Sequence, residues 1–208
     1  MKPSPAITKI IKAARDSRDG DGCAHISAKD VGKLVKARLA SEFPGVKFSV
    51  TSDYNSVNIH WDGFPMQDSV EAITRCYKFG GFDGSIDMEY SSEGWLLPDG
   101  RIAPASCKGT RGQRGAVPEF ATDCPQPGAV LVRGGATYVF ANQYIPAEAW
   151  AEAILSVSAE RGEEVDLSGG VYNCILDGEF ALRDREIQSR VAQVLADGFE
   201  ARRPAVAK

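Results

Sequence analysis

The chain has 208 residues, of which 43% are hydrophobic and 25% are charged, a composition typical of globular proteins with a packed core. Its formal net charge of -4 argues against a protein whose whole surface follows nucleic-acid phosphates, because such binding needs an excess of Lys and Arg, although a local basic patch stays open. No apolar run is long enough to span a bilayer, and the first residues lack the apolar core of a secretory signal, so we expect a cytoplasmic protein without membrane contact.

The first half of the chain is predicted to alternate helices with short strands. An apolar stripe after Pro5 predicts a first helix, and residues 15–22 form a charged, Gly-rich loop. Ser27 and Asp30 make a capping box for a second helix, which ends at Pro44-Gly45. Alternating apolar and polar residues over 46–61 then predict a hairpin with one buried face.

A third helix is expected from Pro65, and it leads into an unusual segment, residues 80–90. If this segment is one strand, its period of two places acidic and polar side chains on one face and apolar side chains on the other. The acidic face consists of Asp83, Ser85, Asp87 and Glu89, and the apolar face of Ile86, Met88 and Tyr90. Pro98-Asp99-Gly100 is predicted to reverse the chain shortly afterwards.

The second half is predicted to begin with a long, irregular excursion over residues 104–128, which is rich in Gly, Pro and Arg. Gly134-Gly135 is a two-residue hairpin signal, and Pro146 starts a helix that ends at Gly162. Asp177-Gly178 is a further hairpin signal. Asp184 is expected to cap a last helix, which Gly198 ends.

These elements predict an α+β fold with a mainly antiparallel sheet built from hairpins and with helices packed on it, because strands and helices do not alternate regularly. We expect an N-terminal helix and acidic loop over 1–22, an α+β domain over 23–145 that contains the loop 104–128, and a tail over 201–208. Residues 146–200 should form a helix, a hairpin and a helix that pack on the same core.

The five cysteines, Cys23, Cys76, Cys107, Cys124 and Cys174, are widely spaced and include no C-x-x-C pair, so we expect reduced thiols without a zinc or redox motif. The two histidines, His25 and His60, stand near no nucleophile motif and are interpreted as structural or solvent-facing. No phosphate-binding loop or metalloprotease motif occurs. We therefore expect no cofactor, no bound metal and no catalytic residue.

Three charged segments are candidate binding sites. The acidic face of Asp83, Asp87 and Glu89 could bind a divalent cation or mimic phosphates toward a basic partner, and a solvated strand face is the simpler alternative.

The run Asp19-Gly20-Asp21-Gly22 resembles part of a calcium loop, but Ala28 stands where the loop needs its bidentate Glu, so an acidic turn is favoured. The Gly-spaced loop 108–115 could bring Lys108, Arg111 and Arg114 to phosphates, or it could be a plain surface loop.

Several sequence segments, in order, resemble the large polyvalent protein-associated domain 29 family. The matching segments are Asp30-Val31, Phe43 to Val50, Ser56 to Gly63, Gly81 to Asp87 and Ala136 to Asn142, which together cover about residues 27–145. The resemblance implies an accessory module of phages and conjugative elements, often part of large proteins thought to protect incoming DNA from host defences. It implies no catalytic residues.

The resemblance, the modest size and the missing catalytic motifs favour a mobile-element accessory protein that counters host defence. Its partner would be a defence-system protein or ribonucleoprotein complex, most concretely a CRISPR complex, and acidic surfaces could dock on the basic grooves where such complexes hold nucleic acid. A nucleic-acid-binding module acting through loop 108–115 is the second hypothesis. The third is a metal-dependent enzyme that uses the acidic strand. The oligomeric state is not encoded in any feature of the sequence.

Overall fold

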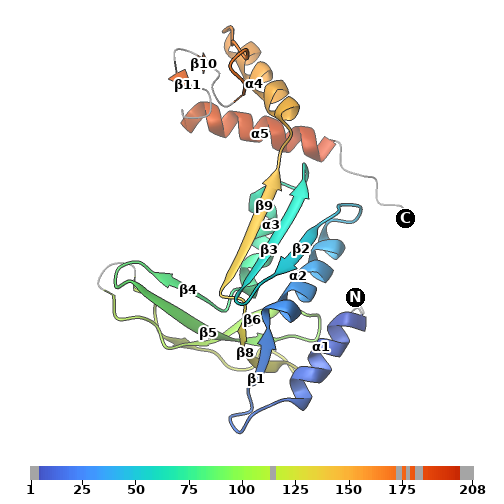
Figure 1. Ribbon diagram of the computed structural model, residues 1–208, viewed down its shortest axis with the longest axis vertical. Helices are drawn as coiled ribbons and strands as arrows, with labels where there is room; N and C mark the ends of the chain where they lie inside the picture. The colour runs from blue at the N-terminus through green and yellow to red at the C-terminus, as the bar shows by residue number, and fades with distance from the viewer. Residues whose placement is uncertain (1–4, 113–115, 172–174, 177–178, 181–184, 202–208) are drawn as a thin grey trace. The chain divides into compact units, whose positions relative to one another are not determined.

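The protein was analysed as a computed structural model that describes residues 5–112, 116–171, 175–176, 179–180 and 185–201. The chain divides into two compact units, one made of Met1–His60 and Asp68–Asn142 and the other of Trp61–Gln67 and Gln143–Lys208. The described elements include both helices and strands, mostly in antiparallel pairs, which confirms the predicted α+β class (Figure 1). No described helix has both the length and the apolar content needed to cross a membrane.

The N-terminal part of the first unit contains α1 (Pro5–Asp16), β1 (Ala24–Ser27) and α2 (Ala28–Glu42). The apolar stripe of α1 is buried as predicted, and α2 begins at the predicted cap, where the Ser27 side chain accepts a hydrogen bond of 3.1 Å from the Asp30 backbone N–H. The boundaries of these helices therefore follow from local sequence signals.

The larger sheet has the strand order β1-β8-β5-β6-β7, and β4 pairs with the other end of β5. Its members are β4 (Gly80–Asp83), β5 (Met88–Leu96), β6 (Ile102–Cys107), β7 (Phe120–Ala121) and β8 (Val130–Gly135). All pairs are antiparallel except β1 with β8. The predicted turn at Pro98-Asp99-Gly100 joins β5 to β6. The predicted irregular excursion 104–128 is wrong at its start, where β6 continues to Cys107, and its other described residues hold only the two-residue β7.

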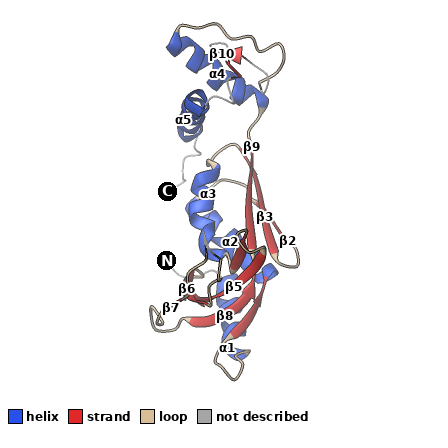
Figure 2. Cartoon of the chain, turned by 90° about the vertical axis from the view of Figure 1, so that its left-hand side faces the viewer, coloured by secondary structure: helices blue, strands red, loops and turns tan. Residues whose placement is uncertain are grey.

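The smaller sheet contains β2 (Ser49–Ser52), β3 (Ser56–Asp62) and β9 (Tyr138–Tyr144), in that order. β2 and β3 form the predicted hairpin, and β9 runs in the same direction as β3 (Figure 1). α2 packs against the inner face, since a Cβ at Gly32 would lie 3.8 Å from Val50 and 4.0 Å from Val57. α3 (Gln67–Thr74), continued by the short helix η1 (Arg75–Tyr77), lies behind the sheet, and no described helix of this unit covers the opposite face (Figure 2).

The predicted hairpin at Gly134-Gly135 is wrong, because β8 and β9 belong to different sheets. Both glycines have positive φ, 85° and 70°, which lets the chain leave β8 abruptly. A Cβ at Gly135 would lie only 2.6 Å from the Phe79 ring, so the chain also needs glycine there to pass the core. The glycine pair therefore transfers the chain between two sheets instead of reversing it within one.

The second unit is built around α4 (Ala147–Arg161) and α5 (Arg185–Ala201), with a short β10 (Ile175–Leu176) and β11 (Glu179–Phe180) hairpin. Gly162 ends α4 in a left-handed conformation as predicted, whereas Gly198 lies inside α5 and does not end it. Asp177, Gly178 and Asp184, on which two further predictions rest, lie outside the described residues.

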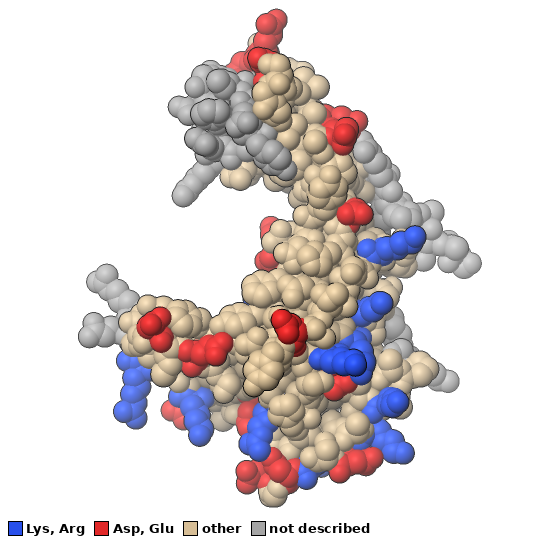
Figure 3. All heavy atoms as spheres, viewed as in Figure 1, with Lys and Arg blue, Asp and Glu red and all other residues tan. Residues whose placement is uncertain are grey.

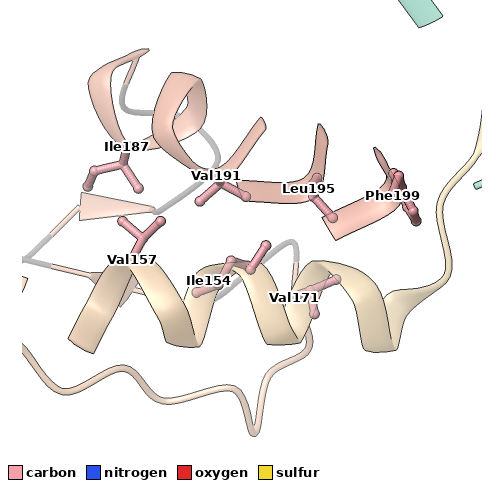
Figure 4. Close-up of a cluster of buried hydrophobic side chains, with 8 residues drawn as sticks. Ile154, Val157, Val171, Ile187, Val191, Leu195 and Phe199 are labelled. Atoms are coloured by element: carbon pink, nitrogen blue, oxygen red, sulfur yellow. The ribbon is translucent and has the colours of Figure 1, made fainter. Parts of the chain in front are cut away.

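Hydrophobic side chains from α4, α5 and Val171 form one buried cluster (Figure 4). Ile154 and Val191 are fully buried at its centre, and Phe199 closes one end. Every residue of this cluster belongs to the second unit. The domain boundaries expected from the sequence stay a prediction, and the structure adds that the C-terminal helices have a hydrophobic cluster within their own unit.

Candidate functional site

Residues 80–90, predicted as one acidic strand, form a hairpin. β4 pairs with β5 in an antiparallel register that places Phe82 opposite Glu89 and Asp83 opposite Met88. Residues 84–87 form the turn, and Asp87 there has a φ of 53°, a left-handed conformation that Asp tolerates better than most residues. Cross-strand partners share a face and neighbours alternate, so Asp83 and Glu89 lie on opposite faces. The predicted convergent acidic face is therefore wrong.

Asp83 is an internal anchor, with only 4% of its surface exposed. Its carboxylate accepts hydrogen bonds from the Ser85 backbone N–H at 2.9 Å, from the Ser85 hydroxyl at 2.6 Å and from the Thr110 hydroxyl. The Ser85 and Thr110 bonds lower the pKa of Asp83, because they stabilise its charged form. Of the three predicted acidic residues, only Asp87 and Glu89 are exposed.

The predicted basic loop is held against this hairpin through Thr110. The Thr110 hydroxyl accepts a hydrogen bond of 2.9 Å from the Val117 backbone N–H, and the Thr110 N–H donates to the Val117 carbonyl at 2.9 Å. Lys108 and Arg111 are exposed on either side of this anchor, and Arg114 lies outside the described residues. The structure thus brings the two predicted binding segments together, although 27 positions separate Asp83 from Thr110.

A groove of about 520 Å³ runs beside the hairpin and over the larger sheet. It contains Glu89 and Lys108 from the two predicted segments. The other polar side chains that line it are His25, Ser91, Ser92, Glu93, Ser106 and Arg133. Both acidic and basic groups therefore line this one groove.

Hydrogen bonds fix several of these groups. The Tyr138 hydroxyl donates to Glu89 at 2.9 Å, which raises the pKa of Tyr138, because the carboxylate favours the protonated phenol. The Ser106 hydroxyl donates to Glu93 at 2.8 Å, and Arg133 forms an ion pair with Asp19. The groove carries charges of both signs, and several of them are fixed by hydrogen bonds or an ion pair. Such a groove is better suited to recognise a polar surface than to attract one highly charged ligand.

Residues 26–143 match the family described as large polyvalent protein associated domain 29, which is more than half of the chain. The chain belongs to this family. No curated protein and no solved structure matches it. The family is the one indicated by the sequence segments, and it associates the protein with phages and other mobile elements.

The large polyvalent protein associated domain 29 spans both sheets of the first unit. The match begins in β1 and ends in β9, so it includes the β4–β5 hairpin, the Thr110 loop and most of the groove. It does not include α1, α4 or α5. The family core is therefore the part of the chain that carries the predicted binding residues.

The exposure of apolar side chains on the hairpin is the feature that the sequence did not reveal. The strand pattern placed Ile86 and Met88 on an apolar face of a strand, but the side chains of Phe82, Ile86 and Met88 are 54%, 38% and 44% exposed. The signal that could have revealed a hairpin is the pair Asp83-Gly84, since Asp and Gly are common turn residues. The family domain thus displays an apolar tip next to a polar groove.

Among the described residues, no hydrogen bond joins His25 or His60 to a hydroxyl or thiol, and no group of three or more His, Cys, Asp or Glu could hold a metal ion. The calcium-like run is a closed turn, because Asp19 accepts hydrogen bonds of 3.0 Å from the N–H groups of both Asp21 and Cys23.

Cys23, Cys76, Cys107 and Cys124 are free thiols, as the odd, dispersed cysteines predicted. Cys174 lies outside the described residues. Cys107, which lines the groove, is buried, and its thiol approaches the Ser91 carbonyl at 3.7 Å. The geometry around Cys107 is that of a packed side chain.

Proposed function

We propose that this protein is a non-enzymatic accessory protein of a phage or other mobile element that counters host defence by binding a protein of a defence system. Inhibition of a CRISPR complex is its most concrete form. Family membership supports the mobile-element context. The exposed surface of the β4–β5 hairpin and β9 supports a protein as the partner.

This surface consists of Phe82, Glu89, Tyr138 and Phe140, which we call the hairpin–β9 surface. Phe82 and Glu89 are cross-strand partners, Glu89 accepts the hydrogen bond from Tyr138, and the Tyr138 ring stacks on Phe140 at a centroid distance of 6.0 Å. Phe82 and Phe140 are about half exposed, at 54% and 48%. Contiguous aromatic side chains with a polar rim are typical of protein–protein interfaces, and they carry the proposal.

The uncharged surroundings of β9 fit the same proposal. The register of β2 with β3 places Thr51 beside Asn58 and Ser49 beside His60, on the face that carries no helix. The space-filling view shows few charged atoms over β3 and β9 (Figure 3). Interface centres are depleted in charged residues, so this region suits a protein partner better than a polyanion.

The proposed role of acidic residues is narrower than the sequence suggested. Asp83 is bonded within the fold, so Glu89 is the carboxylate that can meet a basic group of the partner, and Asp87 stands at the turn. Because Glu89 lies among aromatic side chains, a partner Arg would be desolvated there, which strengthens the pair and adds specificity.

The experiment tests both the inhibition and the surface. A phage targeted by a defined CRISPR system is plated on hosts that do or do not express the protein, and the purified defence complex is mixed with the purified protein in size-exclusion chromatography. We expect restored plaque formation and a stable complex with wild type, and loss of both in the double variant Phe82→Ser, Phe140→Ser. Leu155→Ser is the matched control, because Leu155 is also 50% exposed but lies in α4.

Three outcomes would contradict the proposal. No rescue and no complex across the defence systems tested would remove the anti-defence role. Equal activity of the double variant would remove the hairpin–β9 surface. Inactivation of the complex by far less than one equivalent of protein would indicate an enzyme, since a binding inhibitor acts at stoichiometric amounts.

The second candidate is nucleic-acid binding through loop 108–115, and it rests on the exposure of Lys108 and Arg111, since Arg114 lies outside the described residues. Replacement of both by Ala should then weaken binding to labelled DNA in a salt-dependent manner. Unchanged binding would remove this loop as the contact.

A further inference from the structure

Basic side chains gather on a different part of the first unit, the helical face formed by α1 and α2. The two helices contain seven basic residues, Lys9, Lys12, Arg15, Lys29, Lys33, Lys36 and Arg38, against three acidic ones, Asp16, Asp30 and Glu42. Their net charge is therefore +4, in a chain whose total is -4. Figure 3 shows Lys and Arg side chains crowded on the side where Figure 1 places these helices.

A groove of about 300 Å³ lies between the two helices. Its floor consists of small and aliphatic side chains, among them Ile10, Ala14 and Ile26. Lys9 of α1 and Lys33 of α2 stand on its two walls, and the other polar residues that line it are Ser17, His25 and Asp30. None of the described residues that line this groove is Phe, Tyr or Trp.

Helical spacing extends the basic walls beyond the groove. Lys12 follows Lys9 by three residues, while Lys29 and Lys36 stand four residues before and three residues after Lys33. Side chains three or four residues apart share a helix face. Lys12 thus extends the basic surface of α1 from Lys9, and Lys29 and Lys36 extend that of α2 from Lys33, while Lys9 and Lys33 line the groove itself.

Four of these lysines have no partner in the described part of the chain. Lys33 is engaged by Asp30 at 2.8 Å, Arg38 by Glu42 at 2.8 Å, and Arg15 donates to the Gly128 carbonyl at 2.7 Å. Lys9, Lys12, Lys29 and Lys36 are exposed, and none of them forms an ion pair or hydrogen bond with the residues that the structure describes. Uncompensated lysines on one face are typical of proteins that neutralise phosphates.

We infer that the α1–α2 face binds the phosphate backbone of duplex nucleic acid without sequence specificity. Lysines on flexible stems neutralise phosphates as point charges and read no base edges. Single strands are bound by stacking on aromatic rings, which this groove lacks, so the duplex is favoured. This binding goes beyond the proposed function, which uses the hairpin–β9 surface, and α1 also lies outside the family match.

The test measures binding of the full chain to a labelled 20-base-pair duplex by fluorescence anisotropy between 50 and 200 mM NaCl. If four phosphates are neutralised, the affinity should fall roughly 100-fold over this range, with a slope of about -3.6 on logarithmic axes. The double variant Lys12→Ala, Lys36→Ala should bind on the order of 100-fold more weakly at 50 mM salt, and the magnitude of its slope should be smaller by about 2. Ala is the strongest helix former, so both helices should persist, which circular dichroism checks.

The matched control is Arg75→Ala, Lys78→Ala, which removes the same charge from exposed residues at η1, where no binding role is proposed. We expect the control to keep the wild-type affinity and slope. Three outcomes would each overturn the inference. Wild type could show no duplex binding at 50 mM salt, the α1–α2 variant could keep the wild-type slope, or the control could lose as much affinity as the α1–α2 variant. If polyglutamate displaces the labelled duplex as well as unlabelled duplex does, the α1–α2 face would bind acidic proteins instead. The plaque assay is separate, so either proposal can fail alone.

Discussion

Gly109 offers the sharpest test of how the basic loop is built. It has a φ of 67°, and a Cβ at this position would lie 2.7 Å from both the Glu119 nitrogen and the Val117 carbonyl oxygen. Both atoms belong to the backbone, so neither can rotate away. Gly109→Ala should therefore combine the cost of a left-handed Ala, about 1–2 kcal/mol, with a steric cost of about 1–3 kcal/mol.

Two other glycines separate these contributions. Gly22 has a φ of 75° with no atom within 4 Å of its Cβ position, so Gly22→Ala should lose only about 1–2 kcal/mol. Gly84 has neither a left-handed φ nor a close neighbour, so Gly84→Ala should be neutral or stabilising by about 0.4–1 kcal/mol. The predicted order of stability is Gly84→Ala, then Gly22→Ala, then Gly109→Ala.

Urea unfolding measures the free energies, and hydrogen exchange locates the change. In Gly109→Ala the Thr110 amide, which donates to the Val117 carbonyl, should lose protection, while amides in α4 keep theirs. If Gly109→Ala is as stable as Gly22→Ala, or if Thr110 stays protected, the close backbone approach at this loop is refuted.

Three further predictions address other parts of the molecule. Because hydrogen bonds from two hydroxyls hold the pKa of Asp83 below its usual value, its stabilisation is present above the unfolded-state pKa, about 3.9, and is lost as the pH falls through the folded value. Urea unfolding of Asp83→Asn should therefore show a smaller loss of stability below pH 4 than wild type. Ile154→Ala should cost about 2–5 kcal/mol and raise exchange in α5 but not in β5, whereas Leu155→Ala, at an exposed position, should stay within about 0.5 kcal/mol. Alkylation followed by mass spectrometry should label exposed Cys124 quickly and half-buried Cys76 more slowly, since burial raises the pKa of the Cys76 thiol, and equal rates would contradict this packing.

Local patterns were sufficient for the start of the second helix, the first hairpin, the turn at residues 98–100 and the family. The Ser27 cap, the β2–β3 alternation and the turn at residues 98–100 depend on residues a few positions apart, so the sequence determines them before the chain is folded. The family was likewise predictable, because an ordered set of short segments spans the matched residues.

The candidate surfaces were decided by contacts between distant residues. Asp83 became a buried anchor because Thr110 approaches it, and Glu89 joined an aromatic surface because Tyr138 of another sheet donates to it. The basic face likewise exists only because α1 packs beside α2, which sets Lys9 opposite Lys33. A one-dimensional pattern assigns a side chain to a face of its own element, but only the packing of elements decides whether that face is covered, paired or left to solvent.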